Sequence, residues 1–186
     1  MSTDFAMFPK IPRLSRDIVI TEKIDGTCAV IFVGEDGEFL TGSRKRWITP
    51  DDDNFGFSRW AHEHRDELVV GLGVGRHYGE WWGCGIQRRY GLSEKRFSLF
   101  NTARWHDTDD PTEDANVPEC CRVVPTLYTG PFDHDAVDRA LELLQTYGSC
   151  AAHGFMDPEG VVIYHTAARL YFKKTIVRDE YHKGES

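Results

Sequence analysis

The chain has 186 residues, which is enough for one domain with a sizeable hydrophobic core. Its composition, 40% hydrophobic and 28% charged, is that of an ordinary globular protein and argues against a disordered or membrane-embedded chain. Because the formal net charge is −8, the long-range field repels nucleic acid, and any nucleic-acid contact must be local. Basic clusters occur at residues 44–46, 88–89, 95–96 and 173–174, and each by itself is interpreted as solvated surface.

The cysteines and the start of the chain indicate the cellular setting. The five cysteines are odd in number and lack C-x-x-C spacing, so neither a disulfide framework nor a zinc site is indicated. The first residues, MSTDFAMFPKIPRL, lack the basic and apolar regions of a signal peptide, and no later stretch is apolar for long enough to span a bilayer. We therefore expect a cytoplasmic protein that does not contact a membrane.

The first half of the chain predicts mainly β-strands. DIVITEK predicts one strand, and CAVIFVGEDGEFLTGS predicts a hairpin whose turn is formed by residues 35–37. Residues 54 to 70 follow a polar segment and predict a helix, with Phe55, Trp60 and Leu68 on its buried face. GVGRHYGEWW and RFSLFNTARW predict two further strands.

The second half begins with residues 106–119, whose acids and prolines predict an exposed loop. CRVVPTLYTG predicts a strand. DHDAVDRALELLQTYGS starts with acids and has the apolar spacing of an amphipathic helix, at Val137, Ala140, Leu141 and Leu144. GVVIYH and RLYFKKTI predict two closing strands, so the fold class is α+β with mostly antiparallel sheet.

A lysine stands at the end of the first predicted strand. In VITEKIDGTCAVIFV, Lys23 lies between Glu22 and a turn formed by Asp25 and Gly26. Lysine is a covalent nucleophile only as the free amine, and an ordinary lysine pKa of about 10.4 leaves little of that form at neutral pH unless burial or a nearby cation lowers it. The same four residues, KIDG, also suit an ordinary lysine in a hairpin turn. This segment alone leaves both interpretations open.

Four further segments carry residues suited to nucleotide chemistry. They place Glu80 in HYGEWWG, Phe100 in RFSLFN, Glu159 in DPEGVVIYH, and Lys173 and Lys174 in LYFKKTI. Each has a plain structural explanation, such as an edge residue, a core aromatic, a turn, or lysines on an edge strand. Their order along the chain is more informative than any one of them.

In this order the segments resemble the covalent nucleotidyltransferase superfamily of polynucleotide ligases and messenger-RNA capping enzymes. Its motifs match KIDG at 23–26, SR at 43–44, GE at 79–80, the aromatic strand at 97–100, EG at 159–160 and FKK at 172–174. The matches run from about residue 19 to 176, nearly the whole chain. EKIDGT is most similar to the ATP-dependent RNA ligases of the ligase-2 type. The resemblance implies the nucleotidyltransferase fold of ligases and capping enzymes.

The resemblance implies ATP as the cofactor, with Mg²⁺ or Mn²⁺. Lys23 would attack the α-phosphate of ATP, release pyrophosphate and carry AMP on its nitrogen. AMP would then pass to a 5′-phosphate end, and a 3′-hydroxyl would displace it to form a phosphodiester. The implied partners are RNA ends or a nicked duplex that contains RNA.

The resemblance also assigns residues to the base of the nucleotide. Glu22 would recognise the adenine edge, and Ile24, next to the nucleophile, would belong to the nucleotide-binding segment. An aromatic ring would stack on the base, and the spacing favours Phe100 over Phe97.

Other residues would contact the sugar, the phosphates and the metal ion. Arg44 and Glu80 would hold the ribose or a phosphate. Glu159 would bind the metal ion through water, since hard cations prefer oxygen ligands and often keep several waters. Lys173 and Lys174 would contact the α-phosphate as catalytic lysines, and the sequence does not choose between them.

Two features depart from the family pattern. Cys28 stands where RNA ligases of this type usually have Asn, and a thiol is a poor hydrogen-bonding substitute. The chain ends ten residues after Ile176, so we expect a single nucleotidyltransferase domain over residues 1–186, without an OB-fold or a helical C-terminal domain. The alternatives are a DNA ligase, a ligase whose partner protein supplies the missing clamp, and a catalytically decayed module that binds nucleotide or RNA.

Overall fold

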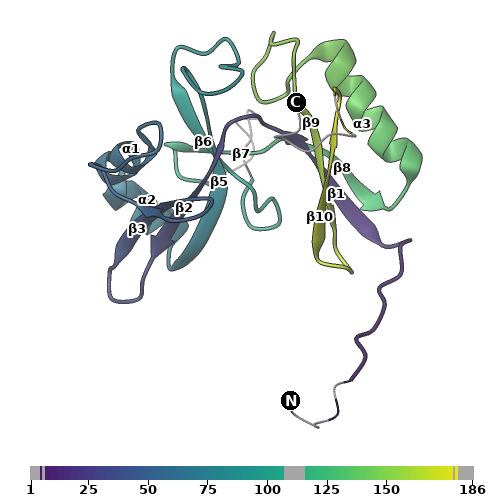
Figure 1. Cartoon of the computed structure of the whole chain (residues 1–186), viewed down its shortest axis with the longest axis horizontal. Coiled ribbons are helices and arrows are strands. Elements are labelled where there is room, and N and C mark those ends of the chain that lie inside the picture. Colours follow the sequence, from purple (N-terminus) through teal and green to yellow (C-terminus); the bar gives the residue numbers. More distant parts are fainter. Residues whose placement is uncertain (1–4, 6, 107–115, 178, 180–186) are drawn as a thin grey trace.

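The computed structural model describes residues 5, 7–106, 116–177 and 179, and within them two β-sheets form the two lobes seen in Figure 1. An antiparallel sheet has the order β10-β9-β1-β8, from β1 (Asp17–Lys23), β8 (Thr126–Pro131), β9 (Gly160–His165) and β10 (Leu170–Thr175). The second sheet has the order β4-β3-β2-β5-β6-β7, from β2 (Thr27–Val33), β3 (Phe39–Ser43), β4 (Trp47–Ile48), β5 (Gly75–Gly83), β6 (Lys95–Leu99) and β7 (Cys121–Val123).

Helices cover one face of each sheet. Helices α1 (Phe57–Glu63) and α2 (Arg65–Leu72) pack on the six-stranded sheet, where Leu68 and Trp81 are part of one buried apolar cluster. Helix α3 (His134–Tyr147) packs on the four-stranded sheet, and its Leu144 belongs to a second cluster with Ile20 of β1. In both sheets alternate strand residues point toward the helices, which leaves the opposite faces for other contacts.

A smaller apolar cluster lies where the two sheets meet. It contains Ile24 from the segment between β1 and β2, Trp82 from β5, Tyr90 from the segment between β5 and β6, and Ala152 from the segment after α3. Because these side chains come from both lobes, the segment that follows Lys23 is held between them. This arrangement positions the candidate site.

Most of the predicted elements are confirmed, including the β2–β3 hairpin, the strands β1, β5, β6, β9 and β10, and the amphipathic helix α3. The α+β class with mostly antiparallel sheet is also confirmed, since only β6 and β7 pair in parallel among the described strands. Asp133 ends the extended chain before α3, and its carboxylate accepts a hydrogen bond from the Asp135 amide, as a helix cap should.

The single helix expected over residues 54–70 is wrong. Phe55 and Gly56 have φ angles of 53° and 81°, which an α-helix excludes, so α1 begins at Phe57. A break at His64 then separates α1 from α2. Leu68 is fully buried as expected and Trp60 is partly buried, but Phe55 is 49% exposed and lies outside the core.

The strand predicted from CRVVPTLYTG is two strands in two different sheets. β7 pairs with β6, whereas β8 pairs with β1. Pro125 lies between them and has no N–H to donate to a sheet, which explains the interruption. Of the acidic segment at residues 106–119, the part 107–115 lies outside the described residues.

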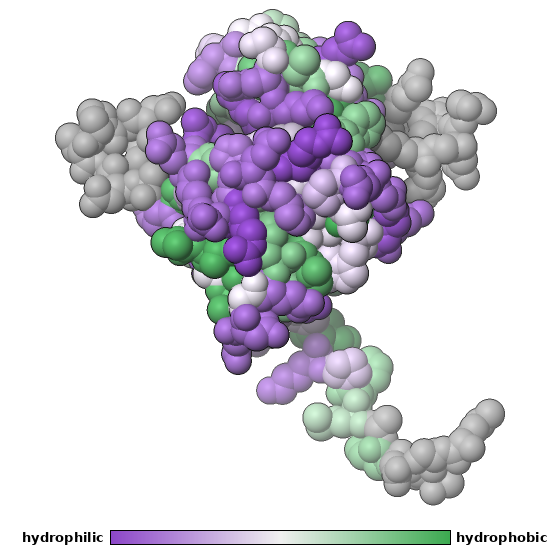
Figure 2. All heavy atoms as spheres, turned by 90° about the vertical axis from the view of Figure 1, so that its left-hand side faces the viewer, coloured by the Kyte–Doolittle hydropathy of each residue, from purple (hydrophilic) through white to green (hydrophobic). Residues whose placement is uncertain are grey.

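An extended arm precedes β1 and projects from the body of the protein (Figures 1 and 2). It exposes apolar side chains, with Phe8 78% and Ile11 80% accessible. Hydrophilic side chains cover most of the face of the body shown in Figure 2. No helix in the described part of the chain is long and apolar enough to cross a membrane.

Candidate active site

A cleft of about 760 Å³ lies between the faces of the two sheets that the helices leave uncovered. The four-stranded sheet contributes Val19, Thr21 and Lys23 of β1, Val162 and Tyr164 of β9, and Tyr171 of β10. The other wall comes from Arg76, Tyr78 and Glu80 of β5 and from residues 100–105 after β6. The cleft therefore joins segments from both halves of the sequence, and five of the residues predicted for the site, Glu22, Lys23, Ile24, Glu80 and Phe100, border it.

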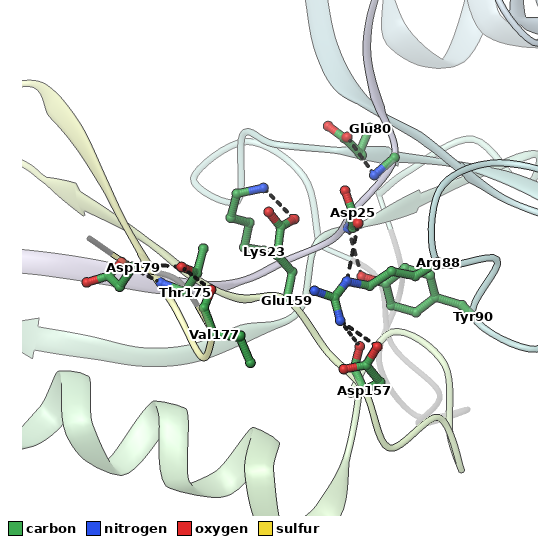
Figure 3. A network of polar contacts seen from close by, with 11 residues as sticks. Lys23, Asp25, Glu80, Arg88, Tyr90, Asp157, Glu159, Thr175, Val177 and Asp179 are labelled. Carbon is green, nitrogen blue, oxygen red and sulfur yellow. Dashed lines mark hydrogen bonds and ion pairs between the residues drawn. The ribbon is translucent and has the colours of Figure 1, made fainter. Parts of the chain in front are cut away.

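Lys23 and Glu159 form an ion pair in this region (Figure 3), with 2.6 Å between Lys23 Nζ and Glu159 Oε2. Sheet register brings them together, because Lys23 lies opposite Gly160, the residue after Glu159. The two side chains are only 21% and 7% exposed, so the pair is largely shielded from water. Gly160 is required there, since a Cβ would lie 2.3 Å from the Lys174 carbonyl oxygen.

Glu80 approaches the same lysine from the opposite sheet. Its Oε1 accepts a hydrogen bond of 3.0 Å from the amide of Gly26, the last residue of the KIDG segment. Burial raises the pKa of Glu80 to about 7, although the positive charge of Lys23 lowers it in part. A Cβ at position 26 would lie 2.5 Å from the Trp81 carbonyl oxygen, so the Asp-Gly pair permits this close contact between β5 and the turn.

Asp25 is held by two side chains that the sequence did not identify. Arg88 Nε donates to the Asp25 carboxylate at 3.2 Å, and the Asp25 backbone amide donates to the Tyr90 hydroxyl at 2.7 Å (Figure 3). Arg88 also pairs with Asp157 at 2.6 Å. The interpretation of Arg88 as solvated surface is therefore wrong: its side chain is 26% exposed and contacts two acids. No pattern in the sequence singles out Arg88 for this role; it simply stands eight residues after Glu80.

Glu22 borders the cleft, but its carboxylate is engaged elsewhere. It accepts hydrogen bonds from the Ser149 hydroxyl at 2.6 Å and from the backbone amides of Cys150 and Ala151 at 2.8 and 2.9 Å. The residue is 1% exposed, and burial raises its pKa although these bonds partly offset that effect. In this structure Glu22 thus ties β1 to the turn after α3, a role that the sequence did not suggest.

The structure distinguishes the two candidate aromatic residues. Phe97 is fully buried among the side chains of the first cluster, beside Phe57 and Trp60. Phe100 follows β6, donates its amide to the Tyr78 carbonyl oxygen, and lines the cleft with a partly exposed ring. Of these two residues, Phe100 is the one placed to stack on a ligand in the cleft.

The two late lysines lie on opposite faces of β10, because strand side chains alternate. Lys174 Nζ pairs with Asp138 of α3 at 2.8 Å, so Lys174 faces the helix rather than the cleft. Lys173 shares its face with Tyr171, which lines the cleft, and it is exposed. The structure therefore brings Lys173 to the cleft side and leaves Lys174 on the other side of the sheet.

Arg44 and Cys28 lie beside the cleft. Cys28 of β2 is opposite Glu80 in the sheet register. Burial, followed by the negative charge of Glu80, raises the pKa of the Cys28 thiol, and the positive charge of Arg44 lowers it. Arg44 itself is exposed immediately after β3 and is not part of the cleft wall.

The described residues contain no cluster of three or more His, Cys, Asp or Glu side chains that could hold a metal ion. Glu159 nevertheless fits a hard divalent cation, because it is a nearly buried carboxylate paired with Lys23, which lines the cleft. Such an ion would take few ligands from the protein and the rest from water and phosphate, as Mg²⁺ often does.

Comparison with known proteins identifies the family and the fold of the chain. The model of a family described as RNA ligase matches residues 16–178. The fold is similar to that of an RNA ligase from Naegleria gruberi. A lysine-to-methionine mutant with AMP and Mn has a TM-score of 0.58 and 18% identity, with 92% of this chain and 53% of that chain covered. A lysine-to-alanine mutant with ATP and Mn has a TM-score of 0.57 and 17% identity, with coverages of 91% and 52%.

This chain therefore spans about half the length of those solved structures. At this identity the likeness concerns the fold alone. No curated protein sequence matches the chain.

Proposed function

Because the chain belongs to the RNA ligase family, we propose that it is an ATP-dependent RNA ligase that forms a covalent lysyl-AMP intermediate on Lys23. The observation that carries this proposal is the shielded pair of Lys23 and Glu159 at the cleft between the two sheets. We also propose that the described residues act as one nucleotidyltransferase domain. An RNA substrate is consistent with the family.

In the first step, the free amine of Lys23 attacks the α-phosphorus of ATP. A P–N bond forms, the P–O bond to pyrophosphate breaks, pyrophosphate leaves with the electron pair, and the nitrogen loses a proton. An ammonium paired with a carboxylate is not nucleophilic, so the Lys23–Glu159 pair must open before attack. A divalent cation bound at Glu159 would neutralise phosphate charge and compete with Lys23 for the carboxylate.

Other side chains at the cleft would hold the nucleotide. Phe100 offers a partly exposed ring for stacking on the base, and Ile24 belongs to the apolar cluster beside it. Glu80 can accept a hydrogen bond from a ribose hydroxyl. Lys173 can contact the α-phosphate from the cleft side of β10. Arg44 is exposed beside Cys28, where a cation can contact a phosphate that extends beyond the cleft.

The later steps transfer the activated phosphate to RNA. The 5′-phosphate of one end attacks the phosphorus of lysyl-AMP, a P–O bond forms, and the P–N bond breaks to regenerate the amine. A 3′-hydroxyl then attacks the 5′-phosphorus, AMP leaves, and a phosphodiester forms. Because the net charge is −8, RNA ends must be held by local contacts rather than by long-range attraction.

Intact-mass spectrometry after incubation with ATP and Mg²⁺ tests the first step. We expect an AMP adduct that peptide mapping assigns to Lys23 and that Lys23→Ala abolishes. Lys45→Ala is the matched control, since this exposed lysine should be dispensable for the adduct. If ATP binds without an adduct, the protein is a nucleotide-binding module rather than a ligase.

Sealing assays test the polynucleotide. Nicked duplexes with RNA, DNA or mixed strands, compared at low salt, should be sealed where RNA forms the nick. Sealing of DNA nicks alone would replace the RNA assignment by a DNA ligase. An adduct without any sealing would indicate a ligase that needs a partner protein to hold the duplex.

A further inference from the structure

The segment between β5 and β6 contacts residues that lie close in sequence to both members of the Lys23–Glu159 pair. Arg88 in this segment contacts Asp25, two residues after Lys23, and Asp157, two residues before Glu159 (Figure 3). One guanidinium therefore connects the chain that carries the nucleophile to the chain that carries its carboxylate partner.

The geometry of this bridge suits a planar guanidinium. Arg88 Nε donates to the Asp25 carboxylate at 3.2 Å, and the neighbouring terminal nitrogen donates to the Asp157 carbonyl oxygen at 2.8 Å and pairs with its carboxylate at 2.6 Å. Arginine holds its donors in a fixed fork, so contact with one acid orients the group toward the other. Lysine has a single ammonium and cannot reproduce both contacts in this orientation.

The backbone around Arg88 is strained. Gln87, Arg89 and Tyr90 have φ angles of 43°, 61° and 50°, in the left-handed region that non-glycine residues rarely occupy. A positive φ angle is unfavourable for a residue with a Cβ, so the surrounding contacts must determine this conformation. The contacts include the Tyr90 ring, which is 2% exposed and packs against Trp82 and Phe155.

Tyr90 and Glu80 complete the support of the nucleophile turn. The Tyr90 hydroxyl accepts the Asp25 amide and Glu80 accepts the Gly26 amide, at 2.7 and 3.0 Å. Arg88 binds the Asp25 carboxylate as well. Three side chains, one from β5 and two from the segment between β5 and β6, therefore hold two consecutive residues. The strained loop thus supports the segment that directly follows Lys23.

We propose that Arg88 is a positioning residue that fixes Lys23 and Glu159 relative to each other through Asp25 and Asp157. This inference rests on the proposed function, in which Lys23 is the nucleophile. A nucleophile displaced by about 1 Å can lose about 10²-fold in rate without losing its substrate. Arg88 contributes to the rate in this way without contacting ATP.

The kinetics of AMP-adduct formation test this role. For Arg88→Ala we expect the maximal rate to fall about 10²-fold while the ATP concentration for half-maximal rate changes less than about threefold. Arg88→Lys should recover part of the loss. Arg89→Asn is the matched control: it removes the same charge from the next residue, is exposed in the structure, and Asn tolerates the positive φ.

Two kinetic results overturn the proposal while the proposed function stands. The first is an Arg88→Ala protein that forms the adduct as fast as the wild type. The second is an Arg89→Asn protein that is impaired as strongly as Arg88→Ala, because the cause would then be charge loss or loop damage rather than the bridge.

Amide hydrogen exchange gives a readout that does not depend on activity. In Arg88→Ala we expect exchange to become about tenfold faster in residues 24–26 and 157–160, with α3 unchanged as an internal reference. If exchange is faster throughout the chain and the melting temperature falls with it, Arg88 acts on global stability and the proposal is wrong. It is also wrong if neither segment changes. Hydrogen exchange tests the connection made by Arg88 even if the wild type forms no adduct. The absence of an adduct in the wild type would refute the proposed function alone.

Discussion

The buried carboxylate of Glu80 makes the stability of the protein depend on pH. Its pKa is about 7 in the folded protein because burial disfavours the charged form, compared with about 4.5 for an ordinary glutamate. Below pH 4.5 the group is protonated in both the folded and the unfolded state. As the pH rises toward 7, the unfolded state loses this proton first, so the free energy of unfolding decreases, and it levels off above pH 7.

The difference between these two pKa values corresponds to about 3 kcal/mol of free energy of unfolding. Most of it, about 2.5 kcal/mol, should be lost between pH 5 and pH 8. In Glu80→Gln this contribution is absent, although the amide oxygen can still accept the Gly26 hydrogen bond. Between pH 5 and pH 8 the free energy of unfolding of the variant should therefore decrease by about 2.5 kcal/mol less than that of the wild type.

Urea denaturation followed by tryptophan fluorescence, at pH 5 and pH 8 with EDTA and without nucleotide, measures this difference. Glu142→Gln is the control, since Glu142 is an exposed glutamate of α3 and its replacement should leave the pH dependence unchanged. Equal pH dependence of the wild type and Glu80→Gln would refute the argument, because burial would then not favour the protonated carboxyl.

Two further predictions concern residues whose expected roles the structure redefines. Glu22→Ala should lower the free energy of unfolding by about 3 kcal/mol, because three donors lose their buried acceptor, and the melting temperature by about 6–12 °C. Differential scanning calorimetry checks this, and a stable variant that lost only ATP affinity would instead support adenine recognition. Lys173→Ala should slow AMP-adduct formation about 10²-fold. Lys174→Ala should not, because Lys174 faces Asp138 in an exposed pair, and the opposite order would contradict the assignment of the two faces.

Local patterns in the sequence were sufficient for most elements. The apolar spacing in α3 and the turn between β2 and β3 depend on residues close together in the chain, so propensity and periodicity could identify them. The two errors have local physical causes as well. Positive φ angles at Phe55 and Gly56 delay the start of α1, and Pro125 separates β7 from β8.

Candidate site residues could be proposed where a motif carries the chemistry in its own residues. KIDG marked Lys23, and the ordered segments marked Glu80, Phe100 and Glu159, all of which the structure brings to the cleft or to Lys23. Arg88 was missed because its two acids are 63 and 69 residues away in the chain. No spacing rule connects residues at such separations.

The sequence by itself determined the nature of the strands and helices, the α+β class and a set of candidate residues around Lys23, because these follow from side-chain chemistry and short-range spacing. Only the tertiary structure decided which candidates meet. Strand alternation placed Lys173 and Lys174 on opposite faces of β10. Packing against the turn after α3 engaged Glu22, and the junction of the two sheets brought Arg88 to Asp25. These outcomes depend on the register and burial of segments distant in sequence, which exist only once the two sheets have assembled.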